Sequence, residues 1–521
     1  MAIVLSGKHG KLDGVRLEIR VKNYRCFGGS HASGFVLKRG ITGFIGENNS
    51  GKSTMLRLFY DLRSLFQVVS DRLEHYQPGE ATTFPLPDLP ADVDRDRFFH
   101  LHNRDPLVVE LLTGGCELDL VCRRDGAFHW KCGTVQPEES TIIRDLRLLS
   151  RMFYIGPFRP FHTHGASGTS FDVVFGEPFY ELCRGIEQGK STQKKELLRD
   201  VGREVSALFG LKGFAFQSGR GGQPGFVVDG DWMPSSEMGS GVGQCFLIYL
   251  QAALRRPSFI LIDEPEAHLH PSVQSDFVTH LAGYAECGLL TSTHHTGLAQ
   301  SVSDHLYRIS RVEGDQHSVI ERYKPDKRLS QTLGELQVPL NGGPEGRRLL
   351  LVEGPTEIKA LRQLLSKMNR EHSVVLLPLG GSSMINGNRE DELREVKKIC
   401  PHVYAVVDSE KRSARDAESQ PHLAFREACS RVGIVCHILE RRALENYFSD
   451  RAVRKVMGLR GLKPFEDIKS VHAKWPKSEN WKVVQAMDRS EWEGTDLWTF
   501  LESVVLKEQI RPSGQEVRNG G

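Results

Sequence analysis

Alternating apolar and polar residues mark the start of the chain. Residues 15–21 alternate with a period of two, which predicts a strand with one buried face. Residues 35–37 and 41–45 are short apolar runs and predict two further strands. Residues 54–60 carry apolar side chains at helical spacing, so we expect a helix there. The segment 46–53 then lies between a buried strand and a helix N-terminus, a position where proteins bind anions.

The loop between this strand and helix reads Gly-Glu-Asn-Asn-Ser-Gly-Lys-Ser and fits the pattern G-x-x-x-x-G-K-[ST]. Its glycines allow the backbone to curve so that the N–H groups point at phosphates. Lys52 is expected to reach the outer phosphates of ATP, and the Ser53 hydroxyl to coordinate Mg²⁺. The expected nucleotide contacts are Gly46, Asn48, Asn49, Ser50, Gly51, Lys52, Ser53 and Thr54.

A run of four apolar residues, 259–262, ends in two carboxylates. It predicts a central strand that is buried on both faces. Asp263 is expected to hold Mg²⁺ through water, and Glu264 to polarise the water that attacks the nucleotide. Two adjacent carboxylates after a buried strand would be costly without a cation, so the pair indicates a site rather than ordinary packing.

Several segments of this first half resemble the ABC-type ATPases of the RecF- and SMC-like group. The segments that carry the resemblance are Asn-Tyr-Arg-Cys-Phe at 23–27, the phosphate-binding loop, Ile-Gly-Pro-Phe-Arg at 155–159, Ser-Gly-Val-Gly-Gln at 240–244, the Asp-Glu strand end, and a buried strand at 288–293 that ends in histidine. They occur in the order that this group has, so the resemblance covers residues 15–310.

The resemblance implies roles that the residues alone do not give. Ser240 and Gly241 would open a helix that faces the γ-phosphate bound to another subunit, which implies a homodimer or higher homo-oligomer. His294 would be a catalytic contact of the γ-phosphate, with the adjacent His295 left open. The magnesium-contacting glutamine is also left open among Gln67, Gln77 and Gln136. We expect an ATPase domain over residues 1–340, with an inserted helical arm at about 170–230.

A change of pattern after the glycine-rich segment 341–346 predicts a second domain over residues 341–521. Four apolar strands alternate with helical segments, which predicts a doubly wound parallel sheet and an α/β fold. Acids follow the strands, and parallel sheets place ligand groups at their carboxyl ends. The acids are Glu353 after the first strand, Glu357 one helical turn later, Asp408 and Glu410 after the third strand, and Glu445 after the fourth. Asp408 and Glu410 are two residues apart, so we expect them on the same face. Such a hard-oxygen set suits Mg²⁺ or Mn²⁺.

The strand-end glutamate and the later acidic pair resemble the Toprim domain of topoisomerases, primases and nucleases. That domain has Asp-x-Asp where this chain has Asp408 and Glu410, which is a departure. The resemblance implies that Glu353, Asp408 and Glu410 are catalytic metal ligands and that Glu445 binds a second ion. Two divalent ions about 4 Å apart stabilise and cleave phosphodiesters. Basic residues flank the acids, as a nucleic-acid backbone requires: Lys397, Lys398, Lys411, Arg412, Arg415, Arg441, Arg442, Arg451, Arg454, Lys455, Arg460 and Lys463.

An ATPase head followed by a Toprim domain resembles the OLD (overcoming lysogenisation defect) family of nucleases. The family implies metal-dependent cleavage of DNA, ATP and Mg²⁺ as cofactors, Mn²⁺ as an alternative ion, and a role in bacterial anti-phage defence. One alternative is an ATP-dependent sensor or scaffold that acts with a defence partner protein and has a degenerate Toprim domain. Another is cleavage of RNA such as tRNA.

The composition of the 521 residues bears on the compartment of the protein, the state of its cysteines and its binding to nucleic acid. The apolar runs are far shorter than the roughly 20 residues that span a bilayer, and the N-terminus lacks a basic-then-apolar leader, so we expect a cytoplasmic protein away from membranes. The ten cysteines contain no C-x-x-C pair and are expected to be reduced thiols. The net charge of +2 does not by itself favour nucleic acid, so a local basic patch would have to provide that contact.

Overall fold

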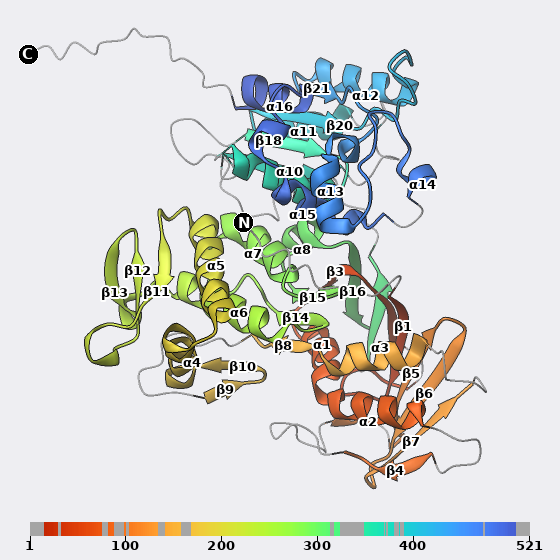
Figure 1. Cartoon of the computed structure of the whole chain (residues 1–521). Helices are drawn as coiled ribbons and strands as arrows, with labels where there is room; N and C mark the ends of the chain where they lie inside the picture. Colours follow the sequence, from red (N-terminus) through yellow and green to blue (C-terminus); the bar gives the residue numbers. More distant parts are fainter. Residues whose placement is uncertain are drawn as a thin grey trace, which may run out of the picture. The chain divides into compact units, whose positions relative to one another are not determined.

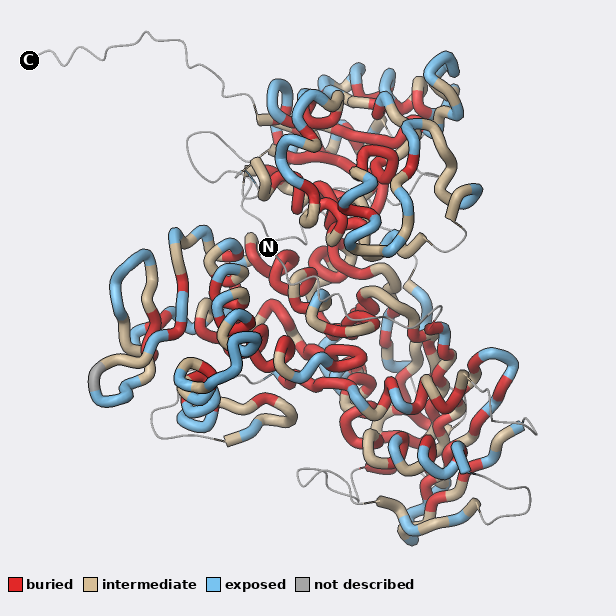
Figure 2. Tube along the Cα trace, in the orientation of Figure 1, coloured by how far each residue is buried: buried red, intermediate tan, exposed pale blue. Residues whose placement is uncertain are grey.

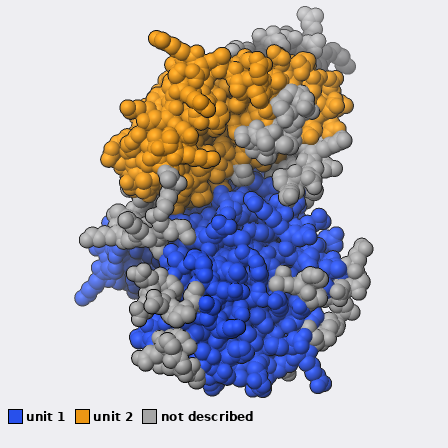
Figure 3. All heavy atoms as spheres, turned by 90° about the vertical axis from the view of Figure 1, so that its right-hand side faces the viewer, with its two compact units in different colours: residues 1–326 blue, residues 327–521 orange. Residues whose placement is uncertain are grey.

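The computed structural model describes residues 15–29, 33–75, 82–87, 98–100, 104–133, 141–157, 168–312, 317–323, 348–368, 370, 373–379, 385, 390–472 and 475–506. The chain divides into two compact units, residues 1–326 and 327–521 (Figure 3). The boundary predicted at residues 340 and 341 lies outside the described residues, as do Arg159 and two of the glutamines that were candidates for the magnesium contact, Gln77 and Gln136.

A six-stranded sheet carries the expected nucleotide-binding residues of the first unit (Figure 1). Its order is β17 (Ser318–Arg322), β16 (His305–Arg311), β3 (Gly40–Ile45), β15 (Gly288–Thr293), β14 (Phe259–Asp263) and β8 (Phe153–Ile155). All neighbours are parallel except β16 and β17. Every residue of β14 and β15 is buried, as we expected for both strands (Figure 2). Their carboxyl ends therefore meet at one edge.

A second six-stranded sheet in this unit is antiparallel throughout. Its order is β2 (Ser33–Lys38), β1 (Arg16–Lys22), β5 (Leu107–Thr113), β6 (Cys116–Cys122), β7 (Ala127–Cys132) and β4 (Thr83–Pro85). Buried and partly exposed residues alternate along β1, β2 and β5, so one face packs on a core. Three helices contribute to that core: α1 (Lys52–Asp61), α2 (Arg63–Glu74) and α3 (Thr141–Ser150).

The segment expected to be a helical arm is mixed α/β. It contains the helices α4 (Glu177–Gln188) and α5 (Thr192–Phe209), the hairpin of β9 (Gly168–Ser170) and β10 (Val173–Phe175), and a sheet of β11 (Phe214–Phe216), β12 (Gly225–Val228) and β13 (Asp231–Pro234). Helix α5 packs on β11 and on α6 (Ser240–Arg255) through apolar residues such as Val201 and Val205. The helical prediction was incomplete because strands this short give little periodic signal.

The segment Asn-Tyr-Arg-Cys-Phe, which lies just before the phosphate-binding loop in the sequence, packs against the end of α1. Asp61, the last residue of α1, is fully buried, and its Oδ2 accepts hydrogen bonds from the Tyr24 hydroxyl at 2.7 Å and from Arg25 at 2.8 Å. Arg57 donates to Oδ1 at 3.3 Å. The motif therefore fixes the helix that begins at the phosphate-binding loop.

Replacing this buried carboxylate should destabilise the first unit strongly. Asp61→Ala leaves two arginines and a tyrosine hydroxyl without their shared acceptor, so we expect a loss of about 3–5 kcal/mol in the free energy of unfolding. Asp61→Asn keeps one acceptor and should lose less. Denaturant unfolding followed by circular dichroism measures both. Equal denaturation midpoints for Asp61→Ala and the unsubstituted protein would contradict the role of Asp61 as the shared acceptor of these side chains.

The second unit is built on one four-stranded parallel sheet. Its order is β19 (Val374–Pro378), β18 (Arg348–Val352), β20 (Val403–Val407) and β21 (Val435–Ile438). The chain passes from β18 to β19 on one side and then crosses to β20 on the other. The strand order therefore reverses between β18 and β20, and ligands bind at such a switch point in open α/β sheets.

Helices cover both faces of this sheet. One apolar core contains Leu350 and Val352 of β18 and the other contains Leu349 and Leu351, as the period of two requires. The first core includes α10 (Pro355–Lys367), α13 (Asp450–Met457), α15 (Asn480–Ala486), α16 (Asp496–Phe500) and the π turn Leu501–Val505. The second includes α11 (Glu390–Ile399) and α12 (Gln420–Arg431), and the short α14 (Ile468–Val471) lies outside both.

Two whole-chain expectations can be compared with the fold. All ten cysteines are free, and seven of them are buried, as expected of reduced thiols. Within the described ranges, no helix combines the length and the apolar character that a bilayer crossing needs. The remaining helices of the first unit are α7 (Pro271–Ala282) and α8 (Thr296–Val302).

Candidate functional site

The phosphate-binding loop adopts the strained backbone that its glycines predict. Gly46 has a φ of +156° and Gly51 a φ of +108°. A Cβ atom at Gly46 would lie 2.1 Å from the carbonyl oxygen of Ile309, so no other residue fits there. Asn49 is also left-handed, with a φ of 63°. The side-chain oxygen of Ser50 is buried and has no hydrogen-bond partner within the described part of the chain. The loop is thus shaped to present polar groups to an anion.

Lys52 lies inside this loop rather than on the surface. It is 7% exposed, and its ammonium donates to the carbonyl oxygens of Gly46 at 2.9 Å and Glu47 at 2.7 Å. Burial lowers the pKa of Lys52, and the nearby carboxylates Asp263, Glu264 and Glu266 oppose that shift. Ser53 and Thr54 follow in the first turn of α1, where Ser53 is exposed. Together these groups fit the phosphates and the Mg²⁺ ion of a nucleotide.

The end of β14 faces the loop with two carboxylates in different environments. Asp263 is 1% exposed, and its Oδ1 accepts a hydrogen bond from the Ser292 hydroxyl of β15. Glu264 has a φ of 49°, and its backbone N–H donates to the carbonyl oxygen of Ser292 at 2.9 Å. A left-handed glutamate is strained, and such strain persists where the surrounding structure fixes it. The neighbouring strand thereby orients both acids.

Glu266 belongs to this site and was not predicted. It is 8% exposed, and its Oε1 accepts from the Thr293 hydroxyl at 2.5 Å and lies 3.2 Å from Nδ1 of His294. His294 is half-exposed, so it can face a ligand, and the ring of His295 contacts it with 4.3 Å between the centroids. The run Asp-Glu-Pro-Glu could have indicated this residue, because its second glutamate, Glu266, follows the end of the buried strand by only a few residues.

Ser240 and Gly241 begin α6, next to the loop that follows β14. Ser240 is exposed and is the first residue of the helix, after an N-cap glycine without a side-chain cap. A Cβ atom on Gly241 would lie 3.0 Å from the carbonyl oxygen of His268, so the start of α6 packs closely on the loop after β14. The exposed N-terminus agrees with a contact made to another copy, which stays a prediction.

In the second unit, Glu353 and Asp408 meet at the switch point of the sheet. Glu353 follows β18 and Asp408 follows β20, and they are 9% and 6% exposed. Oε1 of Glu353 accepts from the backbone N–H of Asp408 at 2.8 Å, and Oδ1 of Asp408 accepts from the backbone N–H of Leu444 at 3.1 Å. Burial, followed by the charge of Glu353, raises the pKa of Asp408 well above its usual range. A cation bound beside these two buried carboxylates would stabilise their charged forms.

Glu357 and Glu445 lie in the same cluster. Burial, with the charge of Glu445 next in size, raises the pKa of Glu357. Glu445 is 1% exposed, and its Oε1 accepts from the amide of Asn480 at 3.0 Å and from the ammonium of Lys477 at 3.0 Å. Neither Lys477 nor Asn480 was predicted, because both lie in the C-terminal helices, far from the strand ends in sequence. The ammonium of Lys482, another cation of these helices, lies near Glu479 at 3.8 Å and over the Trp481 ring.

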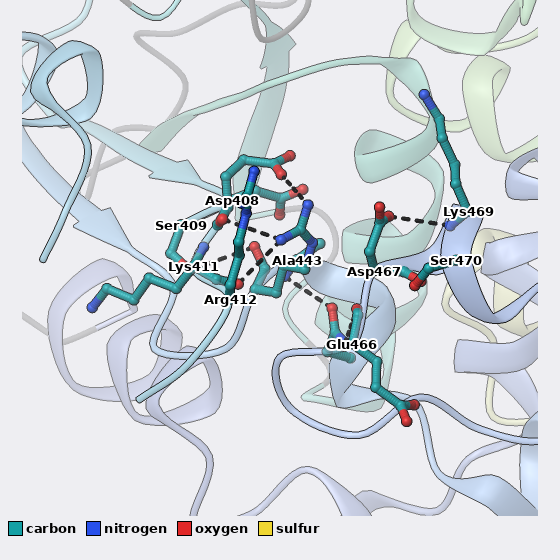
Figure 4. Close-up of polar contacts among 12 residues, drawn as sticks. Asp408, Ser409, Lys411, Arg412, Ala443, Glu466, Asp467, Lys469 and Ser470 are labelled. Carbon is teal, nitrogen blue, oxygen red and sulfur yellow. Dashed lines mark hydrogen bonds and ion pairs between the residues drawn. The ribbon is translucent and has the colours of Figure 1, made fainter. Parts of the chain in front are cut away.

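Glu410 is directed elsewhere. The prediction that it shares a face with Asp408 assumed an extended strand, but β20 ends at Val407 and Glu410 has a φ of 55°. Its side chain is half-exposed and pairs with Arg442 at 3.0 Å. Figure 4 shows Asp408 and Ser409 beside Ala443, while Lys411 extends away from them. The charge of Glu410 still contributes to the raised pKa of Glu353, so Glu410 lies at the margin of the cluster.

Several basic residues around the acids make contacts within the second unit. Arg451 pairs with Glu491 at 2.6 Å, and Arg454 with Asp450 at 2.6 Å. The Arg441 guanidinium lies over the Tyr447 ring and donates to the carbonyl oxygen of Asn446. These contacts use cations that were expected to meet a phosphate backbone. The other basic residues of the predicted set stay candidates for that contact.

The stability of the metal-free second unit should depend on pH. Burial, with contributions from Glu357 and Glu410, raises the pKa of Glu353 from 4.5 to about 7. A raised carboxyl pKa stabilises the fold fully at low pH, and that contribution is lost as pH rises from about 4.5 to about 7. We therefore expect a lower thermal midpoint at pH 8 than at pH 5.5 in chelator.

Mg²⁺ or Mn²⁺ should recover more stability at pH 8 than at pH 5.5, because it binds the ionised carboxylates. Glu353→Gln should flatten the pH dependence. A midpoint that rises from pH 5.5 to pH 8 in chelator, in both the unsubstituted protein and this variant, would contradict the argument.

Comparisons with known proteins agree with the first of these sites. A family model described as "AAA domain, putative AbiEii toxin, Type IV TA system" matches residues 227–299, which include Ser240, Asp263 and His294. No curated protein matches the chain. The family match and the geometry of the strand ends support an ATPase.

Three solved SMC head structures are similar over most of their own length. The "SMC head domain from Thermotoga maritima" is 15% identical, with a TM-score of 0.34, and the match covers 59% of this chain and 99% of that chain. An SmcHead bound to the C-winged helix domain of ScpA is 14% identical, with a TM-score of 0.35 and coverages of 60% and 98%. An Smc head with an extended coiled coil, bound to the C-terminal domain of ScpA derived from Pyrococcus furiosus, is 11% identical, with a TM-score of 0.37 and coverages of 63% and 100%.

Proposed function

We propose that this protein is an ATP-hydrolysing nuclease that cleaves phosphodiester bonds of DNA with the help of divalent metal ions. The observation that carries the proposal is the cluster of Glu353, Glu357, Asp408 and Glu445 with Lys477 at the switch point of the second unit. Several buried acids with raised pKa values at such a place are costly without a function. A hard divalent cation is the ligand that carboxylates of this kind prefer.

In the first unit, different residues would bind the phosphates of the nucleotide, hold its Mg²⁺ ion and activate the attacking water. The loop N–H groups and Lys52 hold the phosphates, and Ser53 with Asp263 would hold Mg²⁺, which supplies charge neutralisation when bound. Glu264 orients and polarises the attacking water, and His294, held by Glu266 at 3.2 Å, contacts the terminal phosphate. The exposed start of α6 at Ser240 would complete the site of a second copy. ATP turnover would then require a homodimer.

In the second unit, Glu353 and Asp408 would hold a divalent ion, and Glu357 with Glu445 a second one. Such ions supply an activated water and stabilise charge on the scissile phosphate. Burial alone would lower the pKa of Lys477, but the charges of Glu445, Glu357 and Asp408 outweigh it, with Glu445 the largest, and raise the pKa. The ammonium therefore keeps its proton at neutral pH. Lys477 therefore acts as a fixed positive charge toward a phosphate oxygen or the leaving group, rather than as a base. Glu410 would join only if it left Arg442.

The biological role we propose is anti-phage defence. The matched family is described as a putative toxin of a type IV toxin–antitoxin system, which is consistent with a nuclease that harms nucleic acid under control. ATP binding and dimerisation in the first unit would control the metal-dependent site in the second. DNA is the preferred substrate in this proposal, and RNA cleavage or a non-cutting sensor are the outcomes that the experiment distinguishes.

The test uses the full chain with supercoiled plasmid, linear DNA and tRNA. Each substrate is incubated with Mg²⁺ or Mn²⁺, with and without ATP, and a chelator arm serves as the blank. Nicking of the plasmid that needs metal and responds to ATP supports the proposal. Cleavage of tRNA alone would assign an RNase instead. ATP turnover without cleavage of any substrate would overturn the nuclease and favour a sensor or scaffold.

A further inference from the structure

Three side chains at the carboxyl edge of the first unit's central sheet lie together beside the nucleotide site. Ligand atoms of Glu266, His294 and His295 all lie within 4.8 Å of one another. Glu266 comes from the turn after β14, and the two histidines follow β15 directly. Because β14 and β15 are parallel neighbours, their ends bring residues together that are almost thirty positions apart in the sequence.

The carboxylate of Glu266 is satisfied by its neighbours at only one of its two oxygens. It is 8% exposed, and its Oε1 accepts from the Thr293 hydroxyl. Its Oε2 is buried and has no hydrogen-bond partner among the described residues. The nearby Lys52 ammonium donates instead to the carbonyl oxygens of Gly46 and Glu47. A buried carboxylate oxygen without a partner is costly, and a cation bound there would remove that cost.

The donor set indicates which cation fits. Two imidazoles and one carboxylate are ligands for Zn²⁺ and related first-row ions, whereas Mg²⁺ and Ca²⁺ take oxygen ligands. We propose that Glu266, His294 and His295 bind one divalent transition-metal ion of the zinc class, at a site distinct from that of the nucleotide's Mg²⁺. Three protein ligands leave a fourth position open on the side of the half-exposed His294.

The binding has a consequence for the nucleotide site. His294 is the residue that we expect at the terminal phosphate, and a metal ion would occupy one of its ring nitrogens and fix its ring. Metal binding would then inhibit ATP hydrolysis and act as a control on the first unit. This consequence rests on the proposed ATPase function, whereas the metal binding itself does not.

The binding is tested by calorimetric titration of the nucleotide-free full chain with ZnCl₂ in buffer that contains excess Mg²⁺. We expect His295→Ala and Glu266→Gln each to lose one zinc site per chain. His268→Asn is the matched control, because His268 is an exposed imidazole in the same region with a φ of 64°, which asparagine tolerates. It should keep the site. The ten cysteines are common to all four proteins, so zinc bound by thiols cancels in the comparison.

Equal zinc stoichiometry in the unsubstituted protein and His295→Ala would overturn the metal site, as would loss of a site in His268→Asn. Circular dichroism confirms that each variant is folded, and His295 is only half-buried, so its replacement should leave the core intact. The site is also expected to give visible d–d absorption with Co²⁺ that is missing in His295→Ala.

The inhibition is tested separately. Each protein is loaded with zinc, freed of excess metal by desalting and assayed for turnover of Mg²⁺-ATP against its own metal-free form. Zinc should lower turnover in the unsubstituted protein and in His268→Asn and have no effect on His295→Ala. If zinc binds but turnover in the unsubstituted protein is unchanged, the proposal that zinc on His294 inhibits ATP hydrolysis is overturned. Plasmid nicking enters neither readout, so the nuclease proposal can fail independently.

Discussion

Asp408→Asn is expected to reduce plasmid nicking by at least about 100-fold, because a buried ligand of the metal site loses its charge. Oδ1 of Asp408 accepts from the backbone N–H of Leu444 at 3.1 Å, and an asparagine oxygen can keep that contact. The buried charge beside Glu353 disappears at the same time, so the metal-free variant should be at least as stable as the unsubstituted protein at pH 8.

Loss of nicking together with retained stability distinguishes a lost metal ligand from a damaged fold. Nicking is measured at saturating Mn²⁺, and stability by thermal unfolding in chelator. Glu427→Gln is the control, because Glu427 is an exposed acid on α12, away from the cluster. Nicking by Asp408→Asn at the rate of this control would remove Asp408 from the site. Full activity of Glu410→Gln would, in contrast, agree with the ion pair that Glu410 makes with Arg442.

Glu264→Gln should lower ATP turnover by roughly 10²–10⁴-fold while ATP binding is retained, because it removes the group that polarises the attacking water. The backbone N–H of Glu264 donates to the carbonyl oxygen of Ser292, and that contact does not depend on the side chain. Glutamine has the same size, so the loop should keep its shape. Lys52→Ala should differ, since it removes a charge from the phosphates and should weaken both binding and turnover.

Turnover is measured by phosphate release and binding by a fluorescent nucleotide. Glu181→Gln on α4 is the matched control, because Glu181 is exposed and lies outside the strand ends. Turnover by Glu264→Gln at the control rate would assign the role to another residue. If Glu264→Gln traps ATP and raises or abolishes plasmid nicking, the nucleotide state of the first unit controls the second. Unaltered nicking would make the two activities independent.

The strand-end residues of the nucleotide site could be predicted because they are local in sequence. Lys52 follows β3 within one loop, and Asp263 and Glu264 come directly after β14. Burial of an unbroken apolar strand and a polar residue at its end are both visible in the sequence. Glu266 was missed because nothing local shows that β15 brings Thr293 and His294 against it.

In the second unit, too, the sequence predicts the strand ends but not the residues that other elements bring to them. The alternation of apolar strands and helices predicted a parallel sheet with Glu353 and Asp408 at its ends, and the strand order then placed them at one switch point. Lys477 and Asn480 come from beyond the sheet, and only packing of the C-terminal helices on it brings them to Glu445. Glu410 was placed wrongly because a period of two holds only while the strand continues.

The sequence by itself determined which residues end buried strands and which loop can hold phosphates, because period, glycine placement and charge are set by neighbours in the chain. The tertiary structure decided which strand ends are adjacent, and therefore which carboxylates, histidines and lysines act together. That choice depends on strand order and helix packing, which join residues far apart in sequence. The grouping of Glu266 with His294 and His295 is the clearest example.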